Sequence, residues 1–224
     1  MPHDHHDHDH DHDHDHDHSG MSPSGHPYRE DQDRTLSYWQ TMEIAARELM
    51  IEKGVITADE VAAQIDAMDA RSPARGAAIV ARAWLDPEFR KLLLVDAPAA
   101  STELGIDIGP LNLIAVENTD KVHNVVVCTL CSCYPRDLLG LPPDWYKSRA
   151  YRTRAVREPR RVLAEFGVEV PQDVTVRVHD STADMRYIVI PARPEGSDGL
   201  DEAALATLVT RDSMIGVGQA RQPG

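Results

Sequence analysis

The sequence predicts an α+β fold, in which a helical N-terminal part precedes a layered α/β/β/α domain. Apolar residues recur at helical spacing between residues 36 and 105, and from residue 111 short apolar or alternating runs typical of strands take over. The order after that point is strands, helix, strands, helix, which predicts a layered sheet core covered by helices. All three cysteines of the 224-residue chain lie between residues 128 and 133, directly after one predicted strand. We therefore expect this loop to be a metal-binding site.

The chain divides into four predicted segments. They are a disordered His/Asp-rich tail (1–35), a helical arm (36–105), a metal-binding catalytic domain (106–217) and a disordered C-terminus (218–224). The first twenty residues contain seven aspartates and neither lysine nor arginine, so they supply about half of the net charge of −14 and cannot bury a core. This His-Asp repeat is either a solvated tail without a catalytic role or a loose binder of divalent metal that passes the metal to the cysteines.

Five helices are predicted in the helical arm. Gly54 ends the first, and a capping-box pattern at residues 57–60 opens the second. The other three begin near residues 73, 86 and 99, the fourth with an aspartate cap and a proline in its first turn. The apolar residues at helical spacing are Trp39, Met42, Ala46, Leu49, Val61, Ile65, Met68, Ile79, Val80 and Trp84. These helices carry no catalytic pattern, and they fit a core or an arm against a partner equally well.

Four strands and two helices are predicted in the second half. The strands cover 111–116, 122–128, 174–178 and 186–190, and the helices cover 151–166 and 200–209. Pro159 interrupts the longer helix, because proline lacks the backbone N–H that a helix interior needs, and Gly167 ends it. Turns are predicted at 118–120 and 195–199.

Composition excludes several classes of protein. The acidic net charge argues against nucleic-acid binding. No apolar run approaches the roughly 20 residues of a membrane span, and the N-terminus lacks the apolar region of a secretory signal. An odd number of cysteines in one loop does not form a disulfide framework, so we expect a reducing cytoplasm.

The spacing of Cys128, Cys131 and Cys133 allows one tight loop to hold a metal ion. Through a metal, the backbone nitrogen and sulfur of Cys133 close a five-membered ring, the nitrogens of Ser132 and Cys133 close another, and the Cys131 sulfur with the Ser132 nitrogen closes a six-membered ring. Three sulfurs and two main-chain nitrogens would then bind one ion and leave a sixth position open. Peptide nitrogens bind only when deprotonated, so a trivalent low-spin cobalt or iron fits better than zinc.

Two other interpretations of the cysteines stay open at this point. A structural zinc site takes four ligands in pairs, but the second pair is missing and neither His123 nor His179 has ligand spacing to the cysteines. A redox Cys-x-x-Cys motif with a spare cysteine is possible, but no thioredoxin-like βαβ pattern surrounds it.

The cysteine motif VVVCTLCSCYP is preceded by ENTDKVHN and followed by LGLPPDWYK, and further along the chain come YRTRAVREPRRVLAEFG, MRYIVIPARPEG and LVTRDSMIG. Together these segments resemble the α subunit of nitrile hydratase over about residues 39–217. Thr129 and Tyr134 match the cobalt-type variant, whereas the iron type usually carries serine after the first cysteine. The γ subunit of thiocyanate hydrolase is a close relative with the same cysteine loop.

The resemblance implies a catalytic domain that hydrates nitriles to amides at Co(III), with Fe(III) as the alternative ion. It implies that Cys131 is oxidised to a sulfinic acid and Cys133 to a sulfenic acid, while Cys128 remains a thiolate. The metal would act as a Lewis acid on the nitrile nitrogen, and water or the Cys133 sulfenate oxygen would attack the nitrile carbon. The Ser132 hydroxyl would lie near the open position, or its side chain merely fits the turn.

The resemblance also implies partners and neighbouring residues. It favours an extended arm for the first two helices, an obligate β subunit in an αβ or (αβ)2 assembly, and a cobalt-loading activator protein. Arg136, Trp145 and Arg186 are the residues that we expect around the pocket. Many nitrile hydratases carry tryptophan where Arg136 stands. An arginine there would favour an anionic substrate such as thiocyanate, or it simply faces the partner subunit. The stretch 109–111 also lacks an amide side chain that many members have.

The sequence thus leaves three functions to compare. Nitrile hydratase is favoured over thiocyanate hydrolase because the segments on both sides of the cysteine motif resemble nitrile hydratases more closely. A non-enzymatic cobalt-binding protein, with the His-Asp tail as collector, is the third. It fits less well because a carrier must release its metal, whereas a trivalent site of this kind exchanges slowly.

Overall fold

The computed structural model describes residues 36–131 and 133–224, arranged in two compact units that divide between Thr57 and Ala58. Each unit is described by itself. The predictions for the tail at 1–35 and for Ser132 lie outside the described residues.

The first unit contains helix α1 (Tyr38–Glu52). Ser37 caps it through a capping box with Gln40, and Gly54 adopts a positive φ of 69° where the helix has ended, as its sequence signals predict. The helix has no buried residue, and the side chain of Trp39 is 78% exposed. Its apolar face therefore finds no cover within the described residues of its own unit.

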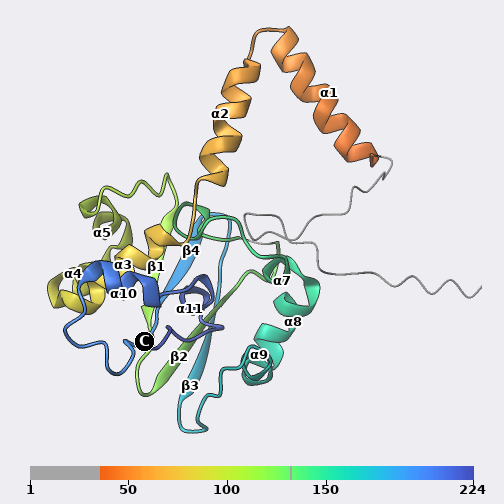
Figure 1. Ribbon diagram of the computed structural model, residues 1–224. Coiled ribbons are helices and arrows are strands. Elements are labelled where there is room, and N and C mark those ends of the chain that lie inside the picture. The colour runs from red at the N-terminus through yellow and green to blue at the C-terminus, as the bar shows by residue number, and fades with distance from the viewer. Residues whose placement is uncertain (1–35, 132) are drawn as a thin grey trace, which may run out of the picture. The chain divides into compact units, whose positions relative to one another are not determined.

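The second unit contains ten helices and four strands among the described residues (Figure 1). The helices are α2 (Ala58–Asp69), α3 (Ala74–Leu85), α4 (Pro87–Val95), α5 (Ala97–Glu103), α6 (Arg136–Leu139), α7 (Asp144–Lys147), α8 (Arg149–Arg157), α9 (Pro159–Glu165), α10 (Glu202–Leu208) and α11 (Arg211–Ile215). The strands are β1 (Asn112–Glu117), β2 (Val122–Val127), β3 (Thr175–Asp180) and β4 (Met185–Ile190). Each strand lies within one or two residues of its predicted bounds.

The strands pair as two parallel couples. β1 pairs with β4, and β2 pairs with β3 in a register that places Val127 opposite Asp180. β2 also contacts β1 and β4, so the two couples pack together. Figure 1 shows α3, α4 and α5 on the side of β1 and β4, and α8 and α9 on the side of β2 and β3. This arrangement confirms the predicted α+β class and its layers.

The core lies between the two couples and beneath their helices. Residues 125–127 of β2 and 188–190 of β4 are each at most 1% exposed, as expected for parallel strands covered on both faces. α3 contributes Ile79 and Val80, which are fully buried. Cys128 directly follows the most buried stretch of β2, so the cysteine loop begins at the edge of the core.

Within residues 36–105, where the sequence left a core or an arm open, α3, α4 and α5 pack on the strands. Two features differ from the predictions. The C-terminus predicted to be disordered is docked: the Arg221 N–H donates to the Leu208 carbonyl oxygen (2.8 Å), and Ala220 is buried. A contact between Arg221 and Leu208 cannot be predicted from the composition of the C-terminal segment alone. The helices α6, α7 and α11 were not predicted, because four or five residues are too few to show a period.

Across the described part of the chain, no helix combines the length and the apolar character needed to cross a membrane.

Candidate metal centre

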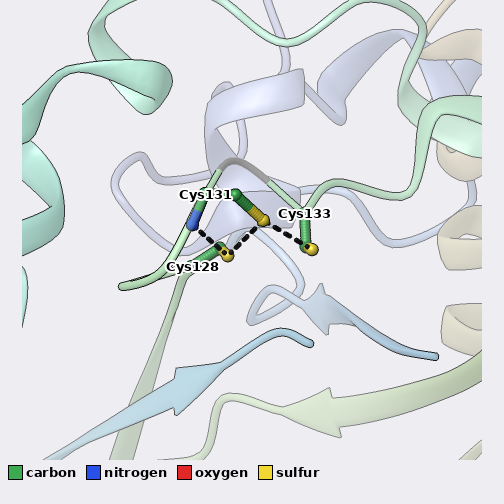
Figure 2. Close-up of side chains that lie close together, drawn as sticks. All are labelled: Cys128, Cys131 and Cys133. Carbon is green, nitrogen blue, oxygen red and sulfur yellow. Dashed lines mark hydrogen bonds between the residues drawn. The ribbon is translucent and has the colours of Figure 1, made fainter. Parts of the chain in front are cut away.

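The three cysteines converge at the carboxyl end of β2 (Figure 2). The sulfur of Cys131 lies 3.4 Å from that of Cys128 and 3.1 Å from that of Cys133, and all three sulfurs lie within 4.8 Å of one another. None of them is in a disulfide. Cys128 is buried, Cys133 is half-buried and Cys131 is exposed, so the cluster has one side in the core and one side open. The predicted convergence of the three thiols is therefore present in the structure.

The turn between Cys128 and Cys131 is closed by a hydrogen bond. The Cys131 backbone N–H donates to the Cys128 sulfur at 3.3 Å. This nitrogen keeps its hydrogen in that contact, so it is not one of the two main-chain nitrogens assigned to the metal. The contact also gives the buried sulfur a hydrogen-bond donor.

Asp180 and Tyr146 hold the two ends of the loop. The Asp180 carboxylate accepts hydrogen bonds from the Thr129 backbone N–H (2.9 Å) and from the Thr129 hydroxyl (2.6 Å). The Tyr146 hydroxyl donates to the Cys133 carbonyl oxygen (2.8 Å). The strand register brings Asp180 there, because it lies opposite Val127, the last residue before the loop.

A pocket of about 340 Å³ opens beside Cys131 and Cys133, and positive charge lines it. The guanidinium groups belong to Arg71, Arg136 and Arg186. Arg71 forms an ion pair with Asp137 at 2.8 Å, which leaves an excess of positive charge around the open side of the thiols. The pocket is thus suited to a ligand that carries or develops negative charge.

The chemistry of the thiols fits a cation. Burial, followed by hydrogen bonds with the Cys131 and Cys128 thiols, raises the pKa of Cys133 to about 12, and the charge of Arg186 opposes this rise. Several thiolates cannot share so small a space without a strong positive charge between them. A metal ion bound to all three sulfurs supplies that charge and makes them thiolates. The site fits cobalt or iron with soft ligands, and the part of the chain that is described offers no second ligand pair for zinc.

The remaining predicted site residues divide into two groups. Arg136 and Arg186 line the thiol pocket. The Nη1 of Arg186 donates to the Thr182, Ala183 and Met185 carbonyl oxygens, which fixes the guanidinium beside Cys133. Trp145 does not line this pocket; its ring packs instead against Tyr146, Tyr151 and Phe166.

Sequence reasoning missed Arg71, Tyr146 and Asp180. Each lies far along the chain from the cysteines or outside any recognisable spacing. Of these residues, only Asp180 could have been suspected from the sequence. A carboxylate at the end of a predicted strand can contact a loop at the end of a neighbouring parallel strand. That inference requires the strand pairing, which the sequence did not supply.

A larger hollow of about 570 Å³ lies at the other end of β2 and contains no thiol. His123 lines it, with its Nε2 2.7 Å from the Gly216 carbonyl oxygen. This hollow is larger than the thiol pocket, but the three sulfurs lie at the smaller one. We therefore take the smaller pocket as the candidate site.

Replacing Asp180 by asparagine is expected to loosen the loop at Thr129. The amide oxygen can still accept from the Thr129 N–H, and the Thr129 hydroxyl can turn to accept from the new amide N–H. Both contacts then lose the charge of the carboxylate and become weaker. Groups that orient metal ligands in this way typically contribute about 10- to 100-fold to metal affinity or activity, and we expect at least about tenfold here. Metal content per chain measures the effect. Asp173→Asn, at an exposed carboxylate paired with Lys121, is the control. Full metal content in Asp180→Asn would contradict the assigned role.

Comparisons with known proteins agree with this site. The family model described as "Nitrile hydratase, alpha chain" matches residues 37–218. A low-molecular weight cobalt-containing nitrile hydratase subunit alpha of Rhodococcus rhodochrous is 50% identical over 188 residues, covering 81% of this chain and 91% of that one. The thiocyanate hydrolase subunit gamma of Thiobacillus thioparus is 47% identical over 194 residues, covering 81% and 80%.

Solved structures agree as well. The thiocyanate hydrolase mutant R136W has a TM-score of 0.79 at 44% identity, covering 85% of this chain and 93% of that one. A double mutant of the Fe-type nitrile hydratase from Comamonas testosteroni Ni1 has a TM-score of 0.76 at 40% identity, covering 84% and 94%.

Proposed function

Since the chain belongs to the nitrile hydratase alpha-chain family, we propose that it is the α subunit of a cobalt-type nitrile hydratase and that it hydrates nitriles to amides together with a β subunit. The observation that carries the proposal is the convergence of the Cys128, Cys131 and Cys133 sulfurs within 4.8 Å of one another beside an open, positively charged pocket. The name of the Rhodococcus rhodochrous relative, a cobalt-containing nitrile hydratase subunit, supports cobalt as the ion.

The proposed ligands are the three sulfurs and the main-chain nitrogens of Ser132 and Cys133. The proposed ion is low-spin Co(III), with Fe(III) as the alternative that the Fe-type neighbour supports. When bound, the ion supplies a Lewis acid that polarises the carbon–nitrogen triple bond of the substrate. Deprotonated amides are strong donors of electron density, and they favour a trivalent ion of fixed geometry over zinc.

The chain's own residues prepare the site for this reaction. Cys128 stays a buried thiolate in the proposal, whereas the more accessible Cys131 and Cys133 are oxidised to sulfinic and sulfenic acid, with dioxygen as the proposed oxidant that accepts four electrons from the Cys131 sulfur and two from the Cys133 sulfur. The new oxygens are negative, and Arg186 lies where it can offset the charge at Cys133. A water beside Cys133 would attack the nitrile carbon directly, or the Cys133 sulfenate oxygen would attack it and a water would then displace the sulfenate from that carbon. Either route adds one water across the triple bond and gives an imidic acid, which tautomerises to the amide. The Ser132 hydroxyl is the proposed proton donor or acceptor at the open position.

The proposed partner is a nitrile hydratase β subunit in an αβ or (αβ)2 complex. Two observations support a partner: Cys131 and the neighbouring Leu130 are exposed, and α1 has no cover for Trp39 or Met42 within its own unit. A cobalt-loading activator belongs to the same proposal, because a trivalent ion enters such a site slowly. The proposed compartment is the cytoplasm, where the thiols stay reduced until the metal is bound.

Thiocyanate hydrolysis to carbonyl sulfide and ammonia is the second candidate, and Arg136 is the observation that favours it. Arg136 lines the thiol pocket with Arg71 and Arg186, so an anion would be attracted there.

Co-expression of the chain with its β partner in cobalt medium tests the proposal. The purified complex is assayed for cobalt, for acrylamide from acrylonitrile, and for carbonyl sulfide and ammonia from thiocyanate. Cobalt with amide formation supports nitrile hydratase. Cobalt with carbonyl sulfide formation selects the second candidate. Tight cobalt binding with neither product overturns both enzymes and indicates a metal-handling protein, whereas tetrahedral zinc overturns the site itself.

A further inference from the structure

Arg152, on α8, directs its hydrogen bonds at the cysteine loop. Its Nη1 donates to the Leu130 carbonyl oxygen at 3.0 Å and reaches the Thr129 carbonyl oxygen at 3.5 Å. Among the described residues, its Nε is buried without a hydrogen-bond partner and the guanidinium has no ion pair. The cation's observed hydrogen bonds are therefore all to the loop that carries the metal ligands.

Arg154, two residues further along the same helix, differs from Arg152 because its charge is balanced by carboxylates. It pairs with Glu158 and Glu165, so carboxylates compensate its charge. A half-buried cation without a carboxylate costs free energy, because it gives up water without gaining a counter-charge. In the proposed site, the thiolates and deprotonated amides bring more negative charge than a trivalent ion neutralises, and this excess compensates Arg152.

A chain of hydrogen bonds links Arg152 to the buried sulfur. The Leu130 carbonyl that accepts from Arg152 belongs to the same peptide group as the Cys131 N–H, and this N–H donates to the Cys128 sulfur at 3.3 Å. A cation on the oxygen of a peptide group makes its N–H a stronger donor, because hydrogen bonds in a chain polarise one another. A stronger donor on a sulfur draws electron density away from the bond that the sulfur makes to a metal.

We propose that Arg152 is a positioning residue that fixes the Cys128–Cys131 turn and, through the Leu130–Cys131 peptide group, holds a polarised N–H on the Cys128 sulfur. The inference rests on the proposed function and deepens it: Arg152 sets how strongly Cys128 donates to the ion, and so how strongly the ion polarises the substrate. Partners of this kind orient ligands and tune the metal although they never touch it.

Two substitutions test the proposal in the cobalt-loaded complex with the β subunit. Arg152→Met keeps an unbranched apolar stem and removes both the charge and the donors, and Arg152→Lys keeps the charge. Arg157→Met is the matched control, because Arg157 is an exposed arginine on the same helix. Each complex is measured for cobalt per chain, for the sulfur-to-cobalt charge-transfer band, for kcat and KM, and for thermal unfolding.

In Arg152→Met we expect the charge-transfer band to move to lower energy, because the Cys128 sulfur regains electron density. We also expect kcat to fall about tenfold with KM changed less than about twofold, and Arg152→Lys to recover part of both. Arg157→Met should match the wild type. An Arg152→Met complex that is loaded and folded but has the wild-type band and kcat would overturn this inference and leave the proposed function standing. A wild-type complex without cobalt would overturn both.

Discussion

On the proposed function, a complex in which Cys128 is replaced by serine is expected to lose its cobalt and to hydrate nitriles more than about a thousandfold more slowly. Cys128 is the innermost of the three thiols, 1% exposed, and the loop folds back on its sulfur through the Cys131 N–H. A serine hydroxyl is a poor substitute, because it stays protonated and is a harder ligand than a thiolate. Metal analysis of the purified complex and the rate of amide formation measure the loss.

The substitution changes one atom, so its effect on the fold should be small. The serine oxygen can still accept the Cys131 N–H, and the surrounding strand is unchanged. The control is thermal unfolding of the metal-free complexes, in which Cys128→Ser and wild type should unfold within a few degrees of each other, on the order of 1 kcal/mol. A Cys128→Ser complex with a full complement of cobalt and normal rates would show that the three-sulfur site is not the catalytic centre.

Replacing Gly216 by alanine is expected to destabilise the second unit by more than about 4 kcal/mol, a size reserved for severe backbone or core damage. Gly216 ends α11 with a positive φ of 87°, and an added Cβ would lie 1.9 Å from the Asn124 carbonyl oxygen. The added Cβ and the Asn124 carbonyl group cannot separate without moving the backbone, because Asn124 is a buried residue of β2. The clash would displace the strand that leads to Cys128, so metal content should fall together with stability.

Gly199→Ala is the matched control for this prediction. Gly199 has nearly the same backbone conformation, with φ 83°, but an added Cβ would meet nothing within 4 Å. It should therefore cost only the strain of the left-handed conformation, about 1–2 kcal/mol. Thermal unfolding of both complexes compares them, and a difference of a few kcal/mol corresponds to roughly 5–10 °C for a chain of this size. Equal unfolding temperatures would mean that α11 and β2 do not meet as described.

Several elements were predictable because their causes are local. Asp86 caps α4 by accepting from the Glu88 and Phe89 N–H groups, and Asp201 caps α10 through the Ala204 N–H. Pro159 divides α8 from α9, because proline lacks the backbone N–H that a helix interior needs, whereas it is tolerated in the first turn of a helix. The strands were found for a similar reason, since their apolar runs are short and bounded by turns.

The site was only partly predictable. The three sulfurs could be found, because their spacing lies within six residues and the loop is too short to separate them. Trp145 was predicted to lie at the pocket because it is close to the cysteines in the sequence. Its ring packs instead against Tyr151 and Phe166. Arg152, Asp180 and Arg71 escaped prediction, because no spacing rule connects a residue to a loop that is brought to it by strand pairing or helix docking.

The sequence by itself determined that the three cysteines lie together and in which order helices and strands follow, because both depend on neighbours a few residues apart. Only the tertiary structure decided that β2 lies beside β3 in parallel, which brings Asp180 to Thr129, and that α8 lies where Arg152 reaches Leu130. The physical reason is that parallel pairing and helix packing are settled by burial of the whole core, and no single segment carries that information.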